Sequence, residues 1–417
     1  MPEYIHPGVY IEEIELGPRP IEGVSTSAGG FVGPTRIGPI AGAPKLVTSL
    51  ADYEEIYGGF EDLDFEFVDE EATARESQTN YMWHAARAFF ENGGKRLYVA
   101  RVYESGADLN QGDGRLPSAA AYEGRDAEGG KTGLASLAEV PEISIIAAPG
   151  HSARLASLSA GENVNRTSQI AMYLIDHCKR LRDRLAVLDS PDQQSPTEVK
   201  HFRAHFDSKY AALYYPWVTV LDPADADGKR QINLPPSGFV AGIYARVDDE
   251  RGVFKAPAAE KLKGAVGLET LLDQKQQEDL NPAGVNCLRN LPGKGFLVWG
   301  SRTMSSDSMW RYVNVRRYFL YLENSIDQGT QWVVFEPNTE ELWSQVRRTI
   351  EHFLHGEWGK GGLMGTKPQE AFFVKVDETT MTQDDIDNGR LNVVIGVAPL
   401  RPAEYVIFRI GQWTVEH

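Results

Sequence analysis

Hydrophobic and polar positions follow two different periods along most of the chain, and this pattern predicts an α/β protein. Short apolar runs bounded by Gly and Pro predict strands, whereas apolar residues every three to four positions predict helices. The predicted strands are residues 97–102, 143–147, 185–188, 213–220, 296–299, 332–335, 372–376, 391–397 and 404–410. The predicted helices are residues 81–90, 170–181, 307–326 and one that begins at Asn338. Strands interleaved with helices indicate a mixed or parallel sheet.

The helix that begins at Asn338 has the strongest local signals. Asn338 is a favourable N-cap, Glu341 follows three residues later, and Gly356 predicts the end of the helix. The apolar stripe expected to face the core consists of Leu342, Val346, Ile350, Phe353 and Leu354. Arg347, Arg348 and Glu351 lie off this stripe, so they face either solvent or a partner.

The first 23 residues form a separate segment in the pattern. A strand-like run consists of Gly8, Val9, Tyr10, Ile11, Glu12, Glu13 and Ile14, and the breakers Gly17, Pro18, Pro20 and Gly23 follow it. Val9 and Ile11 point to one side and Tyr10 and Ile14 to the other, so the strand is apolar on both faces. Because an isolated strand leaves its backbone groups unpaired, we expect this arm to pair with a distant or foreign strand.

Two stretches show neither period and are predicted as loops. Residues 61–76 are acidic and are expected to form a solvated surface loop. Residues 104–133 are rich in Gly, Asp, Ser and Ala and are expected to form a flexible excursion.

Composition narrows the possible classes of protein. The 417 residues, 42% of them hydrophobic, suffice for two or three domains. No apolar run reaches about 18 residues, and the first 30 residues lack the apolar segment of a secretory signal. Cys178 and Cys287 lie far apart in the sequence, and such sparse cysteines are typical of proteins that fold in a reducing compartment. The net charge of −17 disfavours non-specific binding to nucleic acid.

Candidate chemical motifs are incomplete. Gly124 to Thr132 ends in Gly-Lys-Thr, but the spacing from Gly124 is one residue too long for a phosphate loop and no apolar strand leads into it. The pairs His201/His205 and His352/His355 do not match His-Glu-x-x-His, and no second cluster completes a metal site. The run from Pro149 to Ser152 follows a strand but lacks the Gly-x-Ser-x-Gly pattern of a nucleophile. We therefore expect no catalytic, cofactor-binding or metal-binding residues.

Several longer stretches are distinctive in combination. They are residues 7–13 (PGVYIEE), 28–39 (AGGFVGPTRIGP), 89–102 (FFENGGKRLYVARV), 211–217 (AALYYPW), 235–257 (PPSGFVAGIYARVDDERGVFKAP), 280–302 (LNPAGVNCLRNLPGKGFLVWGSR), 310–317 (WRYVNVRR), 335–338 (FEPN), 369–376 (QEAFFVKV) and 402–408 (PAEYVIF). In this order they resemble the phage tail sheath family, which includes the sheaths of R-type pyocins and of extracellular contractile injection systems. Residues 61–76 and 104–133 match least.

The resemblance implies a fold of two mixed α/β domains with extended N- and C-terminal arms that add strands to neighbouring subunits. The expected division is an arm and linker over 1–23, an outer domain over 24–275, an inner tube-facing domain over 276–402 and a C-terminal strand or arm over 403–417. The resemblance also implies six-fold rings stacked around an inner tube protein, with baseplate and terminal cap proteins as further partners. Contraction would start from a metastable extended state and would need no nucleotide.

The resemblance also assigns expected interface residues. The N-terminal arm, Gly8 to Ile14, and a C-terminal strand would contact neighbouring subunits, and Arg347, Arg348 and Glu351 would contact the tube. The C-terminal strand consists of Glu404, Tyr405, Val406, Ile407, Phe408, Arg409 and Ile410. Assembly is expected in the bacterial cytoplasm, with no nucleic-acid partner and no membrane insertion. The alternatives are a nucleotide-dependent α/β enzyme, or another structural tail component such as a terminator.

Overall fold

The computed structural model of the protein describes residues 20–68, 73–104, 116–405 and 407. The described chain divides into two compact units. The larger unit contains residues 24–323 and 399–407, and the smaller unit contains residues 20–23 and 324–398. Each unit combines helices with strands, which confirms the predicted α/β class.

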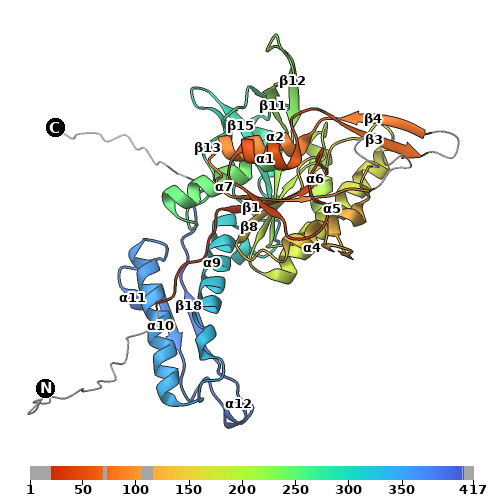
Figure 1. Ribbon diagram of the computed structural model, residues 1–417. Coiled ribbons are helices and arrows are strands. Elements are labelled where there is room, and N and C mark those ends of the chain that lie inside the picture. The colour runs from red at the N-terminus through yellow and green to blue at the C-terminus, as the bar shows by residue number, and fades with distance from the viewer. Residues whose placement is uncertain (1–19, 69–72, 105–115, 406, 408–417) are drawn as a thin grey trace, which may run out of the picture. The chain divides into compact units, whose positions relative to one another are not determined.

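A nine-stranded sheet forms the centre of the larger unit (Figure 1). Its strands in spatial order are β13 (Glu260–Lys261), β16 (Gly295–Val298), β15 (Val285–Leu291), β10 (Ala211–Tyr215), β9 (Leu185–Asp189), β8 (Ile143–Ala147), β1 (Ala28–Gly33), β5 (Leu97–Arg101) and β2 (Lys45–Val47). The strands from β15 to β5 are parallel, and those at the edges are antiparallel. Strands β1, β9 and β10 are buried along their whole length, as expected for parallel strands covered on both faces.

Helices lie around this sheet in the larger unit (Figure 1). They are α1 (Leu50–Tyr57), α2 (Tyr81–Glu91), α3 (Ala119–Glu123), α4 (Gly133–Leu137), α5 (Ala160–Leu181), α6 (Pro196–Ala204), α7 (Ser237–Arg251), α8 (Gln274–Leu280), the 3-10 helix η1 (Ser308–Trp310) and α9 (Val313–Gly329), whose last residues belong to the smaller unit. Helix α7 packs on β8 and β9 and against α2, while α5 contacts β9 and α4 contacts β5. The core of the larger unit lies between these layers.

The acidic stretch is a β-hairpin, so the predicted loop over 61–76 is wrong. It contains β3 (Leu63–Val68) and β4 (Thr73–Gln78), which pair antiparallel. Leu63 and Phe65 are buried and Asp64 between them is exposed, which is the alternation of a strand, whereas Glu66 on the same side as Asp64 is buried. Because the stretch is rich in acidic residues, the alternation was not recognised in the sequence and a loop was predicted.

A small sheet and a short hairpin also belong to the larger unit. The strands β11 (Val218–Leu221), β12 (Gln231–Leu234) and β14 (Gly267–Leu268) form a three-stranded sheet. The strands β6 (Asp126–Ala127) and β7 (Gly130–Lys131) form a short hairpin after α3. Residues 116–133 therefore contain regular elements, whereas the sequence predicted a flexible excursion over 104–133.

The boundary between the two units does not lie between residues 275 and 276, where the sequence predicted a domain boundary. Residues 276–323 belong to the larger unit. Strands β15 and β16 lie in this range, and β15 pairs in parallel with β10 of the nine-stranded sheet. The contacts that decide this placement join residues more than 70 positions apart, for example Leu213 and Val285.

The smaller unit is built on one long helix and a strand pair. Its elements are the end of α9, the 3-10 helix η2 (Gln331–Val333), α10 (Glu340–Gly359), α11 (Pro368–Ala371), β17 (Phe372–Lys375), α12 (Gln383–Asp387) and β18 (Val394–Val397). Helix α10 packs against β17 through its apolar stripe, and all five predicted stripe residues are buried. The strand predicted over 332–335 is wrong, because residues 331–333 form η2.

The predicted ends of α10 need correction. The N-cap is Thr339, whose hydroxyl accepts a hydrogen bond from the Leu342 amide at 3.4 Å. The Asn338 side chain instead accepts from Trp343 Nε1 at 2.7 Å and donates to the Arg390 carbonyl at 3.1 Å. The helix continues past Gly356 to Gly359, because Gly356 keeps helical geometry there.

Candidate assembly interface

The strands β17 and β18 form the strand pair in the described part of the smaller unit. They pair antiparallel from Phe372↔Val397 to Lys375↔Val394, and within the described residues they form a sheet of two strands. The side chains of Phe373 and Val394 are 56% and 46% exposed. An exposed strand edge with apolar side chains is a template for pairing with a further strand.

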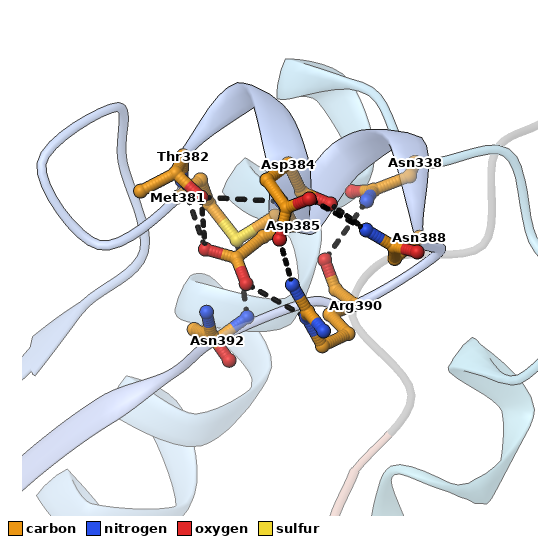
Figure 2. A network of polar contacts seen from close by, with 8 residues as sticks. All are labelled: Asn338, Met381, Thr382, Asp384, Asp385, Asn388, Arg390 and Asn392. Atoms are coloured by element: carbon orange, nitrogen blue, oxygen red, sulfur yellow. Dashed lines mark hydrogen bonds and ion pairs between the residues drawn. The ribbon is translucent and has the colours of Figure 1, made fainter.

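A polar network fixes the connection between β17 and β18 (Figure 2). Thr382 and Asp385 form a capping box at the start of α12, with hydrogen bonds of 3.0 and 3.1 Å between their backbone amides and each other's side chains. Arg390 forms ion pairs with Asp384 and Asp385. The Thr382 hydrogen bonds, helped by Arg390, lower the pKa of Asp385 below its ordinary value. The Asn338 side chain joins this network to the start of α10 through the Arg390 carbonyl.

The predicted tube-contact residues lie together on α10. Arg348 is exposed, and Arg347 and Glu351 are partly exposed. They lie opposite the buried stripe, and within the described chain none of the three forms an ion pair. Their place on the polar side of the helix is confirmed, whereas their contact with a tube stays a prediction.

The C-terminal segment is joined to the larger unit by an ion pair between Arg302 and Glu404, whose side chains are 9% and 16% exposed. Arg302 Nε and Nη2 donate to the two carboxylate oxygens of Glu404 at 2.9 and 2.6 Å. The Tyr312 hydroxyl donates to the same carboxylate at 3.1 Å. Burial works to raise the pKa of Glu404, but the hydrogen bonds and charge of Arg302 outweigh burial and lower it. The Glu404 carboxylate raises the pKa of Arg302 in turn.

The two predicted arms are only partly described. The strand-like run from Gly8 to Ile14 lies outside the described residues, as do Val406, Phe408, Arg409 and Ile410 of the C-terminal strand. Glu404, Tyr405 and Ile407 are described and are not in a strand, so the strand predicted over 404–410 is absent at these positions. A strand needs a hydrogen-bonding partner. The single chain has no neighbouring subunit that could provide this partner strand.

The place where an α/β enzyme would hold a ligand is filled by side chains here. Ligands of such sheets bind where the strand order changes direction, outside the carboxyl ends of the strands, which corresponds to β1 and β8. His151 and Ser152 follow β8 there and are buried, and the hollow beside Gly150 measures only about 10 Å³. Burial lowers the pKa of His151 to about 4, and its Nδ1 contacts the Ala148 carbonyl at 2.6 Å.

The Gly-Lys-Thr sequence belongs to the short β6–β7 hairpin. Lys131 lies in β7 and pairs with Glu139 at 3.0 Å. A phosphate loop would need a strand, a glycine-rich turn and a helix in succession. This hairpin instead places the lysine against a carboxylate of its own chain.

The described residues contain neither a metal-binding cluster nor a membrane-spanning helix. Among these residues, no three His, Cys, Asp or Glu side chains converge in an arrangement that could hold a metal ion. In the same part of the chain, no helix is both long and apolar enough to cross a bilayer.

A buried carboxyl group at the end of β9 gives a pH-dependent prediction. Asp189 accepts hydrogen bonds from the Ser237 amide and hydroxyl, both at 2.7 Å, and thereby caps α7. Burial raises its pKa to about 7, although the Ser237 hydrogen bonds act in the opposite direction. Between about pH 4 and pH 7 the folded protein therefore holds a proton that the unfolded chain has released, so this group makes stability fall as pH rises.

Replacing Asp189 with Asn should remove this pH dependence, because the amide keeps the shape and carries no charge. We expect the stability of Asp189→Asn relative to the wild type to increase by about 1–3 kcal/mol between pH 5 and pH 8. Urea unfolding of both proteins across this range measures the difference. Parallel pH profiles for the two proteins would contradict the prediction.

Sequence reasoning identified Glu404 but missed the residues that hold it. Arg302 and Tyr312 lie 102 and 92 positions before Glu404. Both fall within stretches that carry the family resemblance, and that resemblance was the available signal. Asn338 was identified as a helix cap, whereas its role is to join α10 to Arg390.

Two domain families match the sequence one after the other. Residues 132–304 match the central domain of phage tail sheath proteins, and residues 305–412 match the phage tail sheath C-terminal domain. A prophage major tail sheath protein of Pseudomonas aeruginosa is 25% identical over 313 residues, which cover 72% of this chain and 74% of that protein.

Solved structures are similar over almost the whole chain. The anti-feeding prophage (AFP) helical sheath in its contracted state is 32% identical, with a TM-score of 0.71 over 97% of this chain and 99% of that one. The contracted sheath of the extracellular contractile injection system PVC is 27% identical, with a TM-score of 0.72 over 99% of both chains. Because the domain matches span most of the chain and the similarity to sheath structures is nearly complete, this protein belongs to the phage tail sheath family.

Proposed function

We propose that this chain, a structural subunit of a contractile sheath, polymerises as stacked six-fold rings around an inner tube and contracts without nucleotide to drive that tube forward. The similarity to contracted AFP and PVC sheaths over 97% or more of the chain is the observation that carries this proposal. Baseplate and terminal cap proteins would bound the sheath at its ends. Assembly in the bacterial cytoplasm fits the two buried cysteines, which are both free thiols.

We propose that the N-terminal arm of one subunit adds a strand beside β17 or β18 of another. A six-residue strand gains about six hydrogen bonds, each worth about 1 kcal/mol. Ordering its backbone costs about 1–2 kcal/mol per residue, so the hydrogen bonds alone do not hold it. The surplus must come from apolar burial, worth about 1.5–3 kcal/mol per side chain. The exposed Phe373 and Val394 supply an apolar surface for Val9, Tyr10, Ile11 and Ile14.

Deleting residues 2–15 should abolish polymerisation and leave the subunit folded. The deletion spares Ile21, which is buried and packs against Gly329 in the smaller unit. Electron microscopy should show long cylinders for the full chain and none for the deletion, while circular dichroism and the unfolding midpoint stay close to those of the full chain. Normal cylinders from the deleted chain would refute the role of the arm, and a stable monomer from the full chain at high concentration would count against the sheath assembly itself.

We propose that Arg347, Arg348 and Glu351 form the contact with the inner tube. Each exposed ion pair contributes only about 0–1 kcal/mol, but a long cylinder repeats the contact many times. Replacing Arg347 and Arg348 with Glu should leave the formation of empty cylinders intact and weaken co-assembly with the tube protein, more strongly at low salt. Counting tube-filled particles by electron microscopy measures this effect.

A matched control is Lys261→Glu with Lys263→Glu, which makes the same change in charge at exposed positions of the larger unit. This variant should fill with tube as the wild type does. If the Arg347/Arg348 variant also fills normally, α10 does not contact the tube.

A further inference from the structure

We infer that a pocket in the larger unit binds an organic anion with an aromatic or aliphatic body. The pocket measures about 1070 Å³ and is bounded by α8, by β15 and the residues after β16, by the segment after α7 and by residues 400–405. All the residues that line it belong to the larger unit. Its size reaches the upper end of the range of ligand pockets, about 300–1,000 Å³. A single inorganic ion would fill only a small part of it.

The wall of the pocket is basic, although the chain as a whole carries a net charge of −17. The wall contains four basic and two acidic side chains, which are Arg251, Lys255, Arg289, Arg401, Glu278 and Glu404. The charge of Glu404 is already balanced by Arg302, which does not line the pocket. The remaining surplus of positive charge favours an anion as the ligand.

Arg289 is the basic residue whose surroundings best fit such an anion. Its side chain lies on β15 and is partly buried. Its Nη1 donates to Gln277 Oε1 on α8, which is a neutral acceptor, and within the described chain Arg289 forms no ion pair. A partly buried guanidinium without a carboxylate partner has lost solvation and has gained no opposite charge in return. An anion in the pocket would supply that charge through a charge-assisted hydrogen bond.

Apolar side chains beside this charge would contact the body of the ligand. The pocket is lined by four large apolar side chains, which are Phe254, Leu291, Trp299 and Leu400. Arg289 and Leu291 are two positions apart on β15, so they face the same side of the strand. Gln277 Nε2 also donates to the Trp299 carbonyl at 3.0 Å. One amide therefore holds both the guanidinium and the backbone of the aromatic residue in place before a ligand binds.

A fluorescent probe that combines aromatic rings with an anion tests this inference. Anilinonaphthalene sulfonate has this composition, and its fluorescence reports binding to apolar surface. Titration of the full chain should show one strong site per subunit, and higher salt should weaken it. Phenylnaphthylamine has the same rings without the sulfonate and should bind about tenfold more weakly. Equal affinities for the two probes would show that the pocket does not recognise charge, contrary to the inference.

Variants place the binding site within the molecule. Arg289→Met should weaken the anionic probe about tenfold and change the affinity for the neutral probe by less than about twofold. The matched control is Arg125→Met, because Arg125 is exposed in the same unit and lies outside the pocket. It should bind both probes as the wild type does. If Arg289→Met fails to fold, Arg251→Glu at the exposed end of α7 should weaken the anionic probe in the same way. Equal affinities of the pocket variant and the control for the anionic probe would overturn the inference.

Competition identifies the class of ligand. At constant ionic strength, naphthoate should displace the bound sulfonate, whereas the same concentration of inorganic phosphate should not, because phosphate has no apolar body. Displacement by phosphate would contradict the assignment to an organic anion. Cylinders should bind the probe as free subunits do, and exclusion of the probe from cylinders would show instead that the pocket is a contact between copies of this chain. If the chain forms no cylinders, the proposed assembly fails, while titration of the subunits still decides whether the pocket binds an organic anion.

Discussion

Replacing Arg317 with Met should lower the free energy of unfolding by about 3–5 kcal/mol, because it leaves a buried carboxylate without its partner. Arg317 lies on α9 and donates to both oxygens of Asp248 on α7, at 2.8 and 2.6 Å. The side chains are 3% and 2% exposed. Arg317 also donates to the Thr26 carbonyl at 2.7 Å and stacks 4.7 Å from the Tyr244 ring centre. The substitution therefore removes contacts with α7 and with the segment around Thr26 in the larger unit.

The neighbouring residue on α7 provides a control for this loss. Asp249 pairs with Lys95, whose side chain is 73% exposed. Lys95→Met should not measurably change the unfolding midpoint, because solvent screens this pair. Urea unfolding of both variants makes the comparison. Combining Arg317→Met with Asp248→Leu should recover part of the lost stability, because the unpaired charge is then absent. Equal losses for Arg317→Met and Lys95→Met would contradict the assigned role of burial.

The central strands could be predicted from the sequence because their signals are local. Residues 143–147 were predicted as a strand with the bounds that β8 has, and residues 185–188 differ from β9 by one residue. Helix α7 was missed for the opposite reason. Its residues from Ser237 to Ala245 are all buried, so the helix shows no polar face and no 3.6-residue period. Helices that are buried on all sides cannot be recognised by amphipathic periodicity.

The candidate interface was only partly accessible to sequence reasoning. The apolar stripe of α10 repeats every three to four residues, and this pattern placed Arg347, Arg348 and Glu351 on the opposite side. The ion pair between Arg302 and Glu404 joins residues 102 positions apart, and no local pattern indicates which arginine a given carboxylate meets. The register of the β15–β16 hairpin, in which Leu288 pairs with Val298, brings Asn286 of β15 beside Arg302, and no local pattern in the sequence indicates this register.

Substituting Gly242 with Val should destabilise the larger unit by about 3 kcal/mol, the upper end of the usual cost of overpacking. Gly242 lies on α7 where this helix approaches the backbone of α2. A Cβ atom at this position would lie 2.4 Å from the Phe89 carbonyl oxygen and 3.0 Å from Phe89 Cα. These are backbone atoms in the last turn of α2, so they cannot move aside as a flexible side chain could. Gly238, one turn earlier, meets Ala85 in the same way, with its added Cβ 2.7 Å from the Ala85 carbonyl oxygen.

Gly356 on α10 is the control that separates close packing from helix propensity. An added Cβ there meets no atom within 4 Å, so Gly356→Ala adds a better helix former without a clash. It should stabilise the protein by about 0.5–1 kcal/mol, because Ala loses less backbone freedom on folding than Gly. The two substitutions should therefore change the unfolding midpoint in opposite directions when measured by urea unfolding. A Gly242→Val protein as stable as the wild type would show that α2 and α7 separate at little cost, contrary to the close contact of their backbones.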